Sequence, residues 1–188
     1  MGRQLTRRLR IIGGEWRSRR ISFAPVEGLR PTPDRVRETL FNWLQFSVAG
    51  KRCLDVFAGS GILGIEAASR GAASVRLIEN NEQACAAILL AIGNLGAERF
   101  ALWRGDAIKL LETVPNEVYD IVFIDPPFRK NLVAATVDRL EVHGWMVPAS
   151  KIYIEMEADA PLTELPRTWQ RLKSGTAGDV AYYLYEKN

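Results

Sequence analysis

The sequence after Gly50 alternates between short apolar runs and longer segments with helical spacing. The apolar runs are nearly continuous, as in Ile121-Val122-Phe123-Ile124, and a sheet that is covered on both faces requires strands of this kind. The expected strands are residues 52–57, 74–79, 100–104, 119–125 and 151–157. The expected helices between them are residues 62–70, 82–94, 106–113 and 131–142. This alternation predicts a doubly wound α/β fold, Rossmann-like, with a mostly parallel sheet.

Both ends of the chain depart from the alternation. Residues 169–174 and 180–185 flank a glycine-containing turn and predict a β-hairpin, so the parallel sheet should close with an antiparallel edge. Near the N-terminus, residues 10–14 and 16–23 predict a short hairpin with Gly13-Gly14 at its turn. The C-terminal edge already favours the methyltransferase variant of the fold.

A helix should follow the N-terminal hairpin, with Thr32 as its N-cap and Pro33 at its first position. One face of this helix is expected to be apolar and to consist of Val36, Leu40, Trp43, Leu44 and Ser47. We therefore expect a flexible basic arm (residues 1–10), an extension made of a hairpin and a helix (11–48), and one α/β domain (49–188).

Charge is distributed unevenly along the chain. The formal net charge is +3, but residues 1–37 contain ten arginines and three carboxylates, so this part carries +7 and the remainder −4. A basic arm on a mildly acidic body is typical of a protein that meets a polyanion with one end, and arginine suits phosphate. The alternative is a solvated tail that only aids solubility. The candidates for contact with such a polyanion are Arg7, Arg8, Arg10, Arg17, Arg19, Arg20, Arg30 and Arg35.

Several classes of function are disfavoured by what the sequence lacks. It has no apolar run long enough to span a membrane, and its arginine-rich start is not followed by the apolar stretch of a signal peptide. With one histidine and two distant cysteines, Cys53 and Cys85, no zinc-ligand spacing is available, so no metal site is expected. Two unpaired core thiols indicate a reduced, cytoplasmic protein.

The first expected strand runs into a glycine-rich turn, Ala58-Gly59-Ser60-Gly61. Gly59, Gly61 and Gly64 fit the dinucleotide fingerprint, in which glycines allow a tight turn and close approach of a ligand. The same glycines serve NAD, FAD and S-adenosylmethionine, and a turn without any ligand is the alternative.

Three acids follow or end the strands on the side where such sheets bind ligands. Asp55 can accept from amides of the glycine turn and from the amino-acid end of a ligand. Glu79, twenty residues after Gly59, can accept from ribose hydroxyls. Asp106 can accept from an adenine amino group or cap its own helix, and the two roles are compatible.

The most specific feature is Asp125-Pro126-Pro127-Phe128 after the fourth strand. Two prolines fix two backbone φ angles and leave their carbonyls as rigid acceptors. A carboxylate and a carbonyl that each accept one N–H would favour a pyramidal amine with its lone pair directed at a methyl group. The ring of Phe128 can stack on an extruded base. The alternative is a structural turn in which prolines only end the strand.

Four segments together resemble the bacterial 16S ribosomal RNA guanine-N2 methyltransferases of the RsmD type. They are residues 28–32 (Gly-Leu-Arg-Pro-Thr), 34–44, 55–61 and 125–128. The resemblance extends from about Arg10 to the C-terminal hairpin. It implies the class I methyltransferase fold with a seven-stranded sheet, and S-adenosylmethionine as cofactor. It also implies methyl transfer to the 2-amino group of one guanine of 16S rRNA, within a small-subunit assembly intermediate, by a protein that we expect to be monomeric.

By the same resemblance, Asp125 to Phe128 would hold the guanine. The cofactor pocket would be lined by residues of the strand ends and turns: Phe57, Gly59, Ser60, Gly61, Glu79, Asn80, Asp106 and Ala107. Asp55 of the preceding strand and Ala58 of the glycine turn complete the expected set.

Three other functions compete with this interpretation. A DNA or RNA adenine amino-methyltransferase would use the same chemistry, but 188 residues leave no room for a separate target-recognition domain. A nicotinamide-dependent oxidoreductase is supported by the glycine spacing alone. A non-catalytic RNA-binding assembly factor would not need the Asp125 turn or the cofactor glycines.

Overall fold

The computed structural model describes residues 7–23, 26, 31–96, 98–128, 130–161 and 164–188. Seven strands form one sheet: β3 (Arg52–Asp55), β4 (Ser74–Glu79), β5 (Phe100–Arg104), β6 (Tyr119–Ile124), β7 (Met146–Glu157), β8 (Trp169–Ala177) and β9 (Val180–Lys187). Their order is β5-β4-β3-β6-β7-β9-β8. The first five are parallel, whereas β9 is antiparallel to both β7 and β8. The predicted sheet with an antiparallel C-terminal edge is confirmed.

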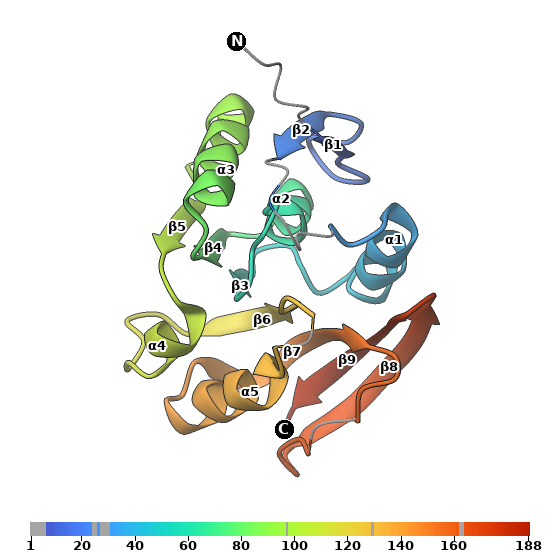
Figure 1. The fold of residues 1–188 in the computed structure, drawn as a ribbon, viewed down its shortest axis with the longest axis vertical. Coiled ribbons are helices and arrows are strands. Elements are labelled where there is room, and N and C mark those ends of the chain that lie inside the picture. The colour runs from blue at the N-terminus through green and yellow to red at the C-terminus, as the bar shows by residue number, and fades with distance from the viewer. Residues whose placement is uncertain (1–6, 24–25, 27–30, 97, 129, 162–163) are drawn as a thin grey trace.

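Helices cover both faces of this sheet (Figure 1). The helices α1 (Asp34–Trp43), α2 (Ile62–Ser69) and α3 (Glu82–Leu95) lie on one face. The helices α4 (Ala107–Leu111) and α5 (Leu132–Val142) lie on the other. The sheet separates two apolar clusters, one beneath each layer of helices, which is why strands such as β6 are apolar on both sides.

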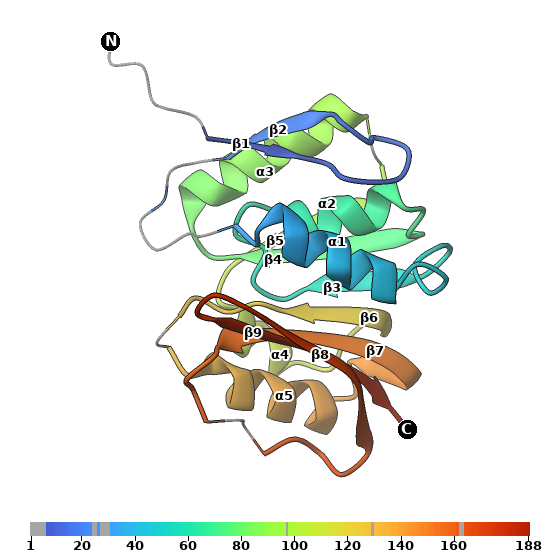
Figure 2. The same cartoon turned by 90° about the vertical axis from the view of Figure 1, so that its right-hand side faces the viewer.

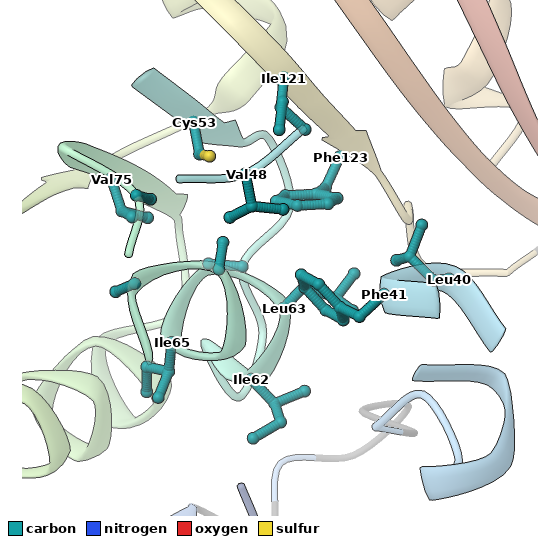
Figure 3. Packing of buried hydrophobic residues seen from close by; sticks show 14 of the residues in the cluster. Leu40, Phe41, Val48, Cys53, Ile62, Leu63, Ile65, Val75, Ile121 and Phe123 are labelled. Atoms are coloured by element: carbon teal, nitrogen blue, oxygen red, sulfur yellow. The ribbon is translucent and has the colours of Figure 1, made fainter. Parts of the chain in front are cut away.

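Helix α2 is buried along its whole length. It packs so closely on the sheet that a side chain at Gly64 would place its Cβ 2.4 Å from Leu77 and 2.9 Å from Val75. Figure 3 shows Leu63 of this helix beside Phe41 of α1, with Phe123 of β6 nearby. The rings of Phe41 and Phe123 have centroids 6.0 Å apart. Close packing of α1 and α2 on β3 and β6 therefore fixes the turns that follow those two strands.

The N-terminal hairpin differs from the prediction. Its strands are β1 (Arg7–Arg10) and β2 (Arg20–Phe23), so residues 7–10 pair in a sheet where we expected a flexible arm. Residues 1–6 of that arm lie outside the described residues. Gly13-Gly14 lies in the connection between these two strands, as expected, and Gly14 has a φ angle of 77°. The connection is longer than a tight turn, and this dipeptide packs on the end of α2. A Cβ at Gly14 would lie 1.8 Å from the Ser69 carbonyl oxygen, so close packing and the positive φ angle both require glycine here.

The connection between β1 and β2 is held on α2 by hydrogen bonds. The amides of Ile12 and Gly13 donate to the Glu66 carboxylate at 2.9 and 2.7 Å. The Trp16 amide donates to the Ser69 hydroxyl at 3.0 Å. Figure 2 shows the hairpin as an outer layer above α2 and α3. The N-terminal extension is thus packed on the α/β domain.

The start of α1 corrects a second prediction. Thr32 does not cap the helix: Pro33 occupies the N-cap position and no side chain caps it. The Thr32 hydroxyl instead donates to a carboxylate far away in the sequence, described below. The expected apolar face is largely confirmed, since Val36, Leu40 and Leu44 are buried. No helix within the described ranges is long and apolar enough to cross a membrane.

Candidate active site

The two predicted turns meet at the point where the chain reverses its direction across the sheet. From β3 the chain winds outward through β4 to β5 and then returns to β6 on the other side of β3. Strands β3 and β6 are parallel neighbours, with Asp55 opposite Phe123. The glycine turn after β3 and the Asp125 turn after β6 therefore leave the sheet side by side. Open α/β sheets bind ligands in the crevice at this position.

The glycine turn has the conformation that its residues predict. Gly59 and Gly61 have φ angles of 54° and 76°, in the left-handed region that glycine adopts without strain. Gly61 occupies the N-cap position of α2. The Ala58 amide donates to the Ile78 carbonyl at 2.9 Å, which ties the turn to β4. The turn delivers the chain directly into the N-terminus of α2.

Asp55 lies beneath this turn and is 1% exposed. Its Oδ2 accepts from the Gly64 amide at 3.1 Å, while Oδ1 has no hydrogen-bond partner among the described residues. Burial raises the pKa of Asp55 to about 7; the Gly64 amide lowers it and the charge of Glu79 raises it further. A buried carboxyl group with one oxygen unpartnered is costly to keep, and such groups often mark binding sites.

Glu79 at the end of β4 holds the glycine turn in place. Its two oxygens accept from the Gly59 amide and from the Asn81 amide, each at 2.7 Å. Asn81 in turn caps α3 through the Ala84 amide. Because each carboxylate oxygen has a second lone pair, these bonds leave Glu79 able to accept from ligand hydroxyls. Asn80, next to it, is exposed.

Asp106 caps α4, because its Oδ1 accepts from the Lys109 amide at 3.0 Å. The predicted capping role is therefore confirmed. Asp106 also borders a mostly apolar hollow of about 260 Å³. The hollow is lined by Ile78, Trp103, Gly105, Asp106, Lys109, Leu110 and Thr113. Ala107, the first residue of α4, is buried next to it.

The second turn begins with Asp125, which is half-buried directly after β6. Pro126 is buried, Pro127 is exposed and Phe128 is half-buried. Asp125 Oδ2 accepts a hydrogen bond of 3.1 Å from the Thr32 hydroxyl. The turn thus presents a carboxylate held at one oxygen, rigid proline carbonyls and an aromatic ring.

A second acid adjoins Asp125. Glu155 of β7 is 4% exposed, and its Oε2 accepts from the Tyr153 hydroxyl at 2.8 Å. Burial raises the pKa of Asp125 well above its usual value, and the charges of Glu155 and Asp55 raise it further, against a lowering by Thr32. Burial also raises the pKa of Glu155. This part of the site therefore favours one negative charge over two.

Thr32, Glu155 and Tyr153 were missed in the sequence. Glu155 interrupts the apolar run Ile152–Met156 of β7, and that break in the pattern is a usable signal. Thr32 gave no such signal, because a threonine before Pro33 also fits an N-cap.

The predicted RNA-contacting arginines fall into separate groups. Arg8, Arg10 and Arg20 are exposed and line a hollow of about 330 Å³ together with Leu9 and Asp34. Arg10 pairs with Asp34 at 3.5 Å. Arg7 is exposed at the start of β1, and Arg35 is exposed on α1.

Two further candidates lie at the other end of the hairpin, and one is not described. Arg17 is exposed. Arg19 donates to the Asn94 carbonyl at 2.8 Å near the C-terminal end of α3, so part of its guanidinium serves the fold. Arg30 lies outside the described residues. No group of three or more His, Cys, Asp or Glu side chains suited to a metal ion occurs in the described parts of the chain.

The strand order, the antiparallel edge and the two turns at the reversal point define a class I methyltransferase fold.

A model of the family Conserved hypothetical protein 95 matches residues 9–186, and the chain belongs to this family. It is 42% identical over 179 residues to ribosomal RNA small subunit methyltransferase D of Escherichia coli strain K12, covering 95% of this chain and 90% of that protein. It is 40% identical over 181 residues to the protein of the same name from Haemophilus influenzae, covering 95% and 93%. The solved structure of yhhF from Escherichia coli has a TM-score of 0.90 and 40% identity, covering 96% of this chain and 98% of that one. The predicted resemblance is confirmed.

Proposed function

We propose that this protein transfers a methyl group from S-adenosylmethionine to the exocyclic 2-amino group of a guanine in 16S rRNA. The observation that carries the proposal is the position of Asp125 to Phe128 beside the glycine turn, at the C-terminal ends of β6 and β3. The relatives named as methyltransferases of small-subunit ribosomal RNA support the choice of substrate.

The residues of the first turn fit this cofactor. The unpartnered Oδ1 of Asp55 suits a cationic or N–H donor, as the amino-acid end of S-adenosylmethionine provides. Glu79 would accept from the ribose, and Asp106 with Ala107 and the adjoining apolar hollow would receive the adenine. Phe57, Ala58, Ser60, Gly61 and Asn80 complete the lining. When bound, the cofactor supplies an electrophilic methyl group on a sulfonium.

The second turn would act on the acceptor amine. The amine of guanine is a weak nucleophile because its lone pair is delocalised into the ring. Asp125 Oδ1 and a proline carbonyl would each accept one N–H, so that the lone pair becomes available for in-line displacement. A nitrogen–carbon bond forms, the carbon–sulfur bond breaks to leave S-adenosylhomocysteine, and the proton shed by the nitrogen passes to Asp125 or to water. Phe128 would stack on the base.

The basic hairpin would engage the RNA backbone. Arg8, Arg10 and Arg20 line one concave surface, and Arg7 lies next to it on β1. Clustered arginines on one face are the electrostatic footprint of a nucleic-acid surface. Arg17, Arg30 and Arg35 remain proposed contacts, and Arg19 would contribute only what its bond to α3 leaves free.

We further infer that the extension (residues 11–48) serves the methyltransferase domain (49–188) and that residues 1–10 contact RNA. All seven strands of the main sheet follow Gly50, which supports this division. The buried free thiols of Cys53 and Cys85 favour a reducing cytoplasm. We also infer a monomer that acts on an assembly intermediate. Light scattering tests the first point and the substrate comparison below tests the second.

The deciding experiment uses labelled S-adenosylmethionine with small-subunit particles that lack modification, and in parallel with naked 16S rRNA. Mass spectrometry of the labelled nucleotide is expected to identify N2-methylguanine, with more label in particles than in naked RNA. Label on adenine would support the competing amino-methyltransferase, and no label in either substrate would contradict the proposal. Calorimetry with S-adenosylhomocysteine and with NADH separates the oxidoreductase, which alone should bind NADH.

A further inference from the structure

Thr32 belongs to the N-terminal extension, yet its side chain lies in the candidate active site. It is 2% exposed, and its hydroxyl donates to Asp125 Oδ2 across 93 positions of sequence. No side chain caps α1, so this hydroxyl is used at Asp125 in place of the cap that the sequence predicts. The contact links a residue outside the α/β domain to the carboxylate that would hold the amine.

The backbone of Thr32 is fixed by a buried ionic network. Arg37 Nε donates to the Thr32 carbonyl at 3.2 Å. The Arg37 side chain is 0% exposed and pairs with Asp34 at 2.6 Å and with Glu66 at 3.4 Å. Glu66 lies on α2, the helix that begins at the glycine turn. Arg37 therefore holds the Thr32 backbone in place relative to α2. Removing either Arg37 or Glu66 would leave the other charge buried without this partner, which is costly.

A carboxylate needs such support because the torsion that rotates its plane is soft. One hydrogen bond to Oδ2 fixes this plane and defines where Oδ1 lies. A displacement of about 1 Å in a reacting group costs on the order of 100-fold in rate. A change in the orientation of Asp125 should therefore be measurable as a change in the rate of methyl transfer.

We propose that Thr32 is a positioning residue, which holds Asp125 Oδ2 so that Oδ1 is presented to the acceptor amine. The role given to Oδ1 rests on the proposed function, whereas the hydrogen bond between Thr32 and Asp125 does not depend on it. The N-terminal extension then completes the catalytic site in addition to any contact with RNA.

The bond also has an electrostatic consequence. Asp125 faces three titratable groups, namely Glu155 and Tyr153 from β7 and Asp55 from β3. Burial and the two carboxylates raise the pKa of Asp125, and the Thr32 hydroxyl lowers it. Removing the hydroxyl should therefore raise this pKa further, because a hydrogen bond to the ionised form is lost.

The test compares Thr32→Val, which keeps the shape of the side chain, with Thr32→Ser, which keeps the hydroxyl. Thr39→Val is the matched control, because its hydroxyl donates to the Arg35 carbonyl at 3.0 Å on the same helix. Single-turnover methyl transfer is measured from pH 5.5 to 9, together with S-adenosylhomocysteine affinity and melting temperature. Thr32→Val should lose about 10- to 100-fold in rate, with its acid limb moved to higher pH and cofactor affinity retained. Thr32→Ser should recover most of the rate, and Thr39→Val should match the wild type.

Carboxyl ¹³C NMR of the labelled aspartates, with Asp125→Asn to assign the signal, reads the pKa of Asp125 without any activity. An upward change in Thr32→Val supports the positioning role. Equal pKa and equal rate in wild type and Thr32→Val would overturn it. Absence of transfer by the wild type would refute the proposed function instead, and the titration would still decide whether Thr32 holds Asp125.

Discussion

Replacing Asp55 by asparagine should stabilise this protein at neutral pH. The carboxyl group is buried, its Oδ2 accepts from Gly64, and its Oδ1 has no partner within the described residues. Asparagine keeps the shape and the acceptor for Gly64 but cannot ionise. The variant therefore removes the buried charge, and the N–H donors that replace Oδ1 add a cost that does not depend on pH.

The pH dependence of this gain follows from the pKa of Asp55, which burial raises from its ordinary value of 3.8 to about 7. An acid with a raised pKa in the folded state contributes stability at low pH and loses it as the pH rises from 3.8 towards 7. The slope is about 1.4 kcal/mol for each pH unit in this window. The advantage of Asp55→Asn should thus grow by about 2–3 kcal/mol between pH 5 and pH 7, then level off. For a chain of this size that is about 5–10 °C in melting temperature.

Calorimetric or circular-dichroism melting without cofactor, from pH 5 to pH 8, measures this difference. Asp120→Asn is the control: burial raises the pKa of Asp120, but bonds from the Arg52 amide and Lys51 outweigh it and the pKa is lowered. The ionised Asp120 carboxylate stabilises the fold, and this contribution is lost only as the pH falls below the ordinary pKa of 3.8. Asp120→Asn should therefore be destabilised by a constant amount from pH 5 to pH 8. A similarly flat difference for Asp55→Asn would refute the reasoning.

Three further predictions test the fold, the chemistry and the RNA surface. Gly64→Ala should lose about 1–3 kcal/mol in urea unfolding, because its Cβ would clash with Leu77 and Val75. Gly93→Ala, in open space within α3, should instead gain about 0.5–1 kcal/mol; equal effects at both sites would contradict the packing of α2. Asp125→Ala should bind S-adenosylhomocysteine as the wild type does and lose methyl transfer, and unchanged transfer would remove Asp125 from the mechanism. Exchanging Arg7, Arg8 and Arg10 for glutamine should weaken RNA binding and flatten its salt dependence. The same exchange at Arg171 and Lys173 on β8 is the control, and an unaltered slope in the first variant would return the arm to a solubilising role.

Local pattern was enough to predict most of the α/β domain. Strands β4 and β5 begin and end at the predicted residues, and β6 is buried on both faces, as a doubly covered strand requires. Strand β7 was predicted five residues too short: it begins at Met146 and passes an irregular register around Ala149, whose φ is 63°. A bulge of this kind depends on pairing with β6, which periodicity does not report.

The N-terminal extension was harder to predict because its partners are distant. Gly13-Gly14 fits a hairpin turn by local rules, but its conformation is set by contact with α2, more than 50 residues away. Arg37 is likewise fully buried against Glu66, a partner 29 positions away in the sequence. One signal was available: Glu66 is an acid within the otherwise apolar segment Ile62–Ser69. A buried acid of this kind needs either a cationic partner or hydrogen-bond donors, and Glu66 has both.

The acids that break the apolar pattern of the strands lie in the candidate active site. Asp55, Asp125 and Glu155 end or interrupt apolar strands, and burial raises the pKa of each. Such groups lower stability, and natural proteins keep them chiefly where a ligand or a reaction needs them. By contrast, Glu66 and Arg37 are buried as an ion pair, and their role is to hold the extension against α2. The type of partner therefore distinguishes the two kinds of buried acid. The structural acid Glu66 pairs with a cation. The acids at the reversal point accept hydrogen bonds from hydroxyl or amide groups and lie near one another. The acids that lack a cationic partner therefore mark the reactive end of the site. The N-terminal extension contributes to this end through Thr32, whose hydroxyl donates to Asp125.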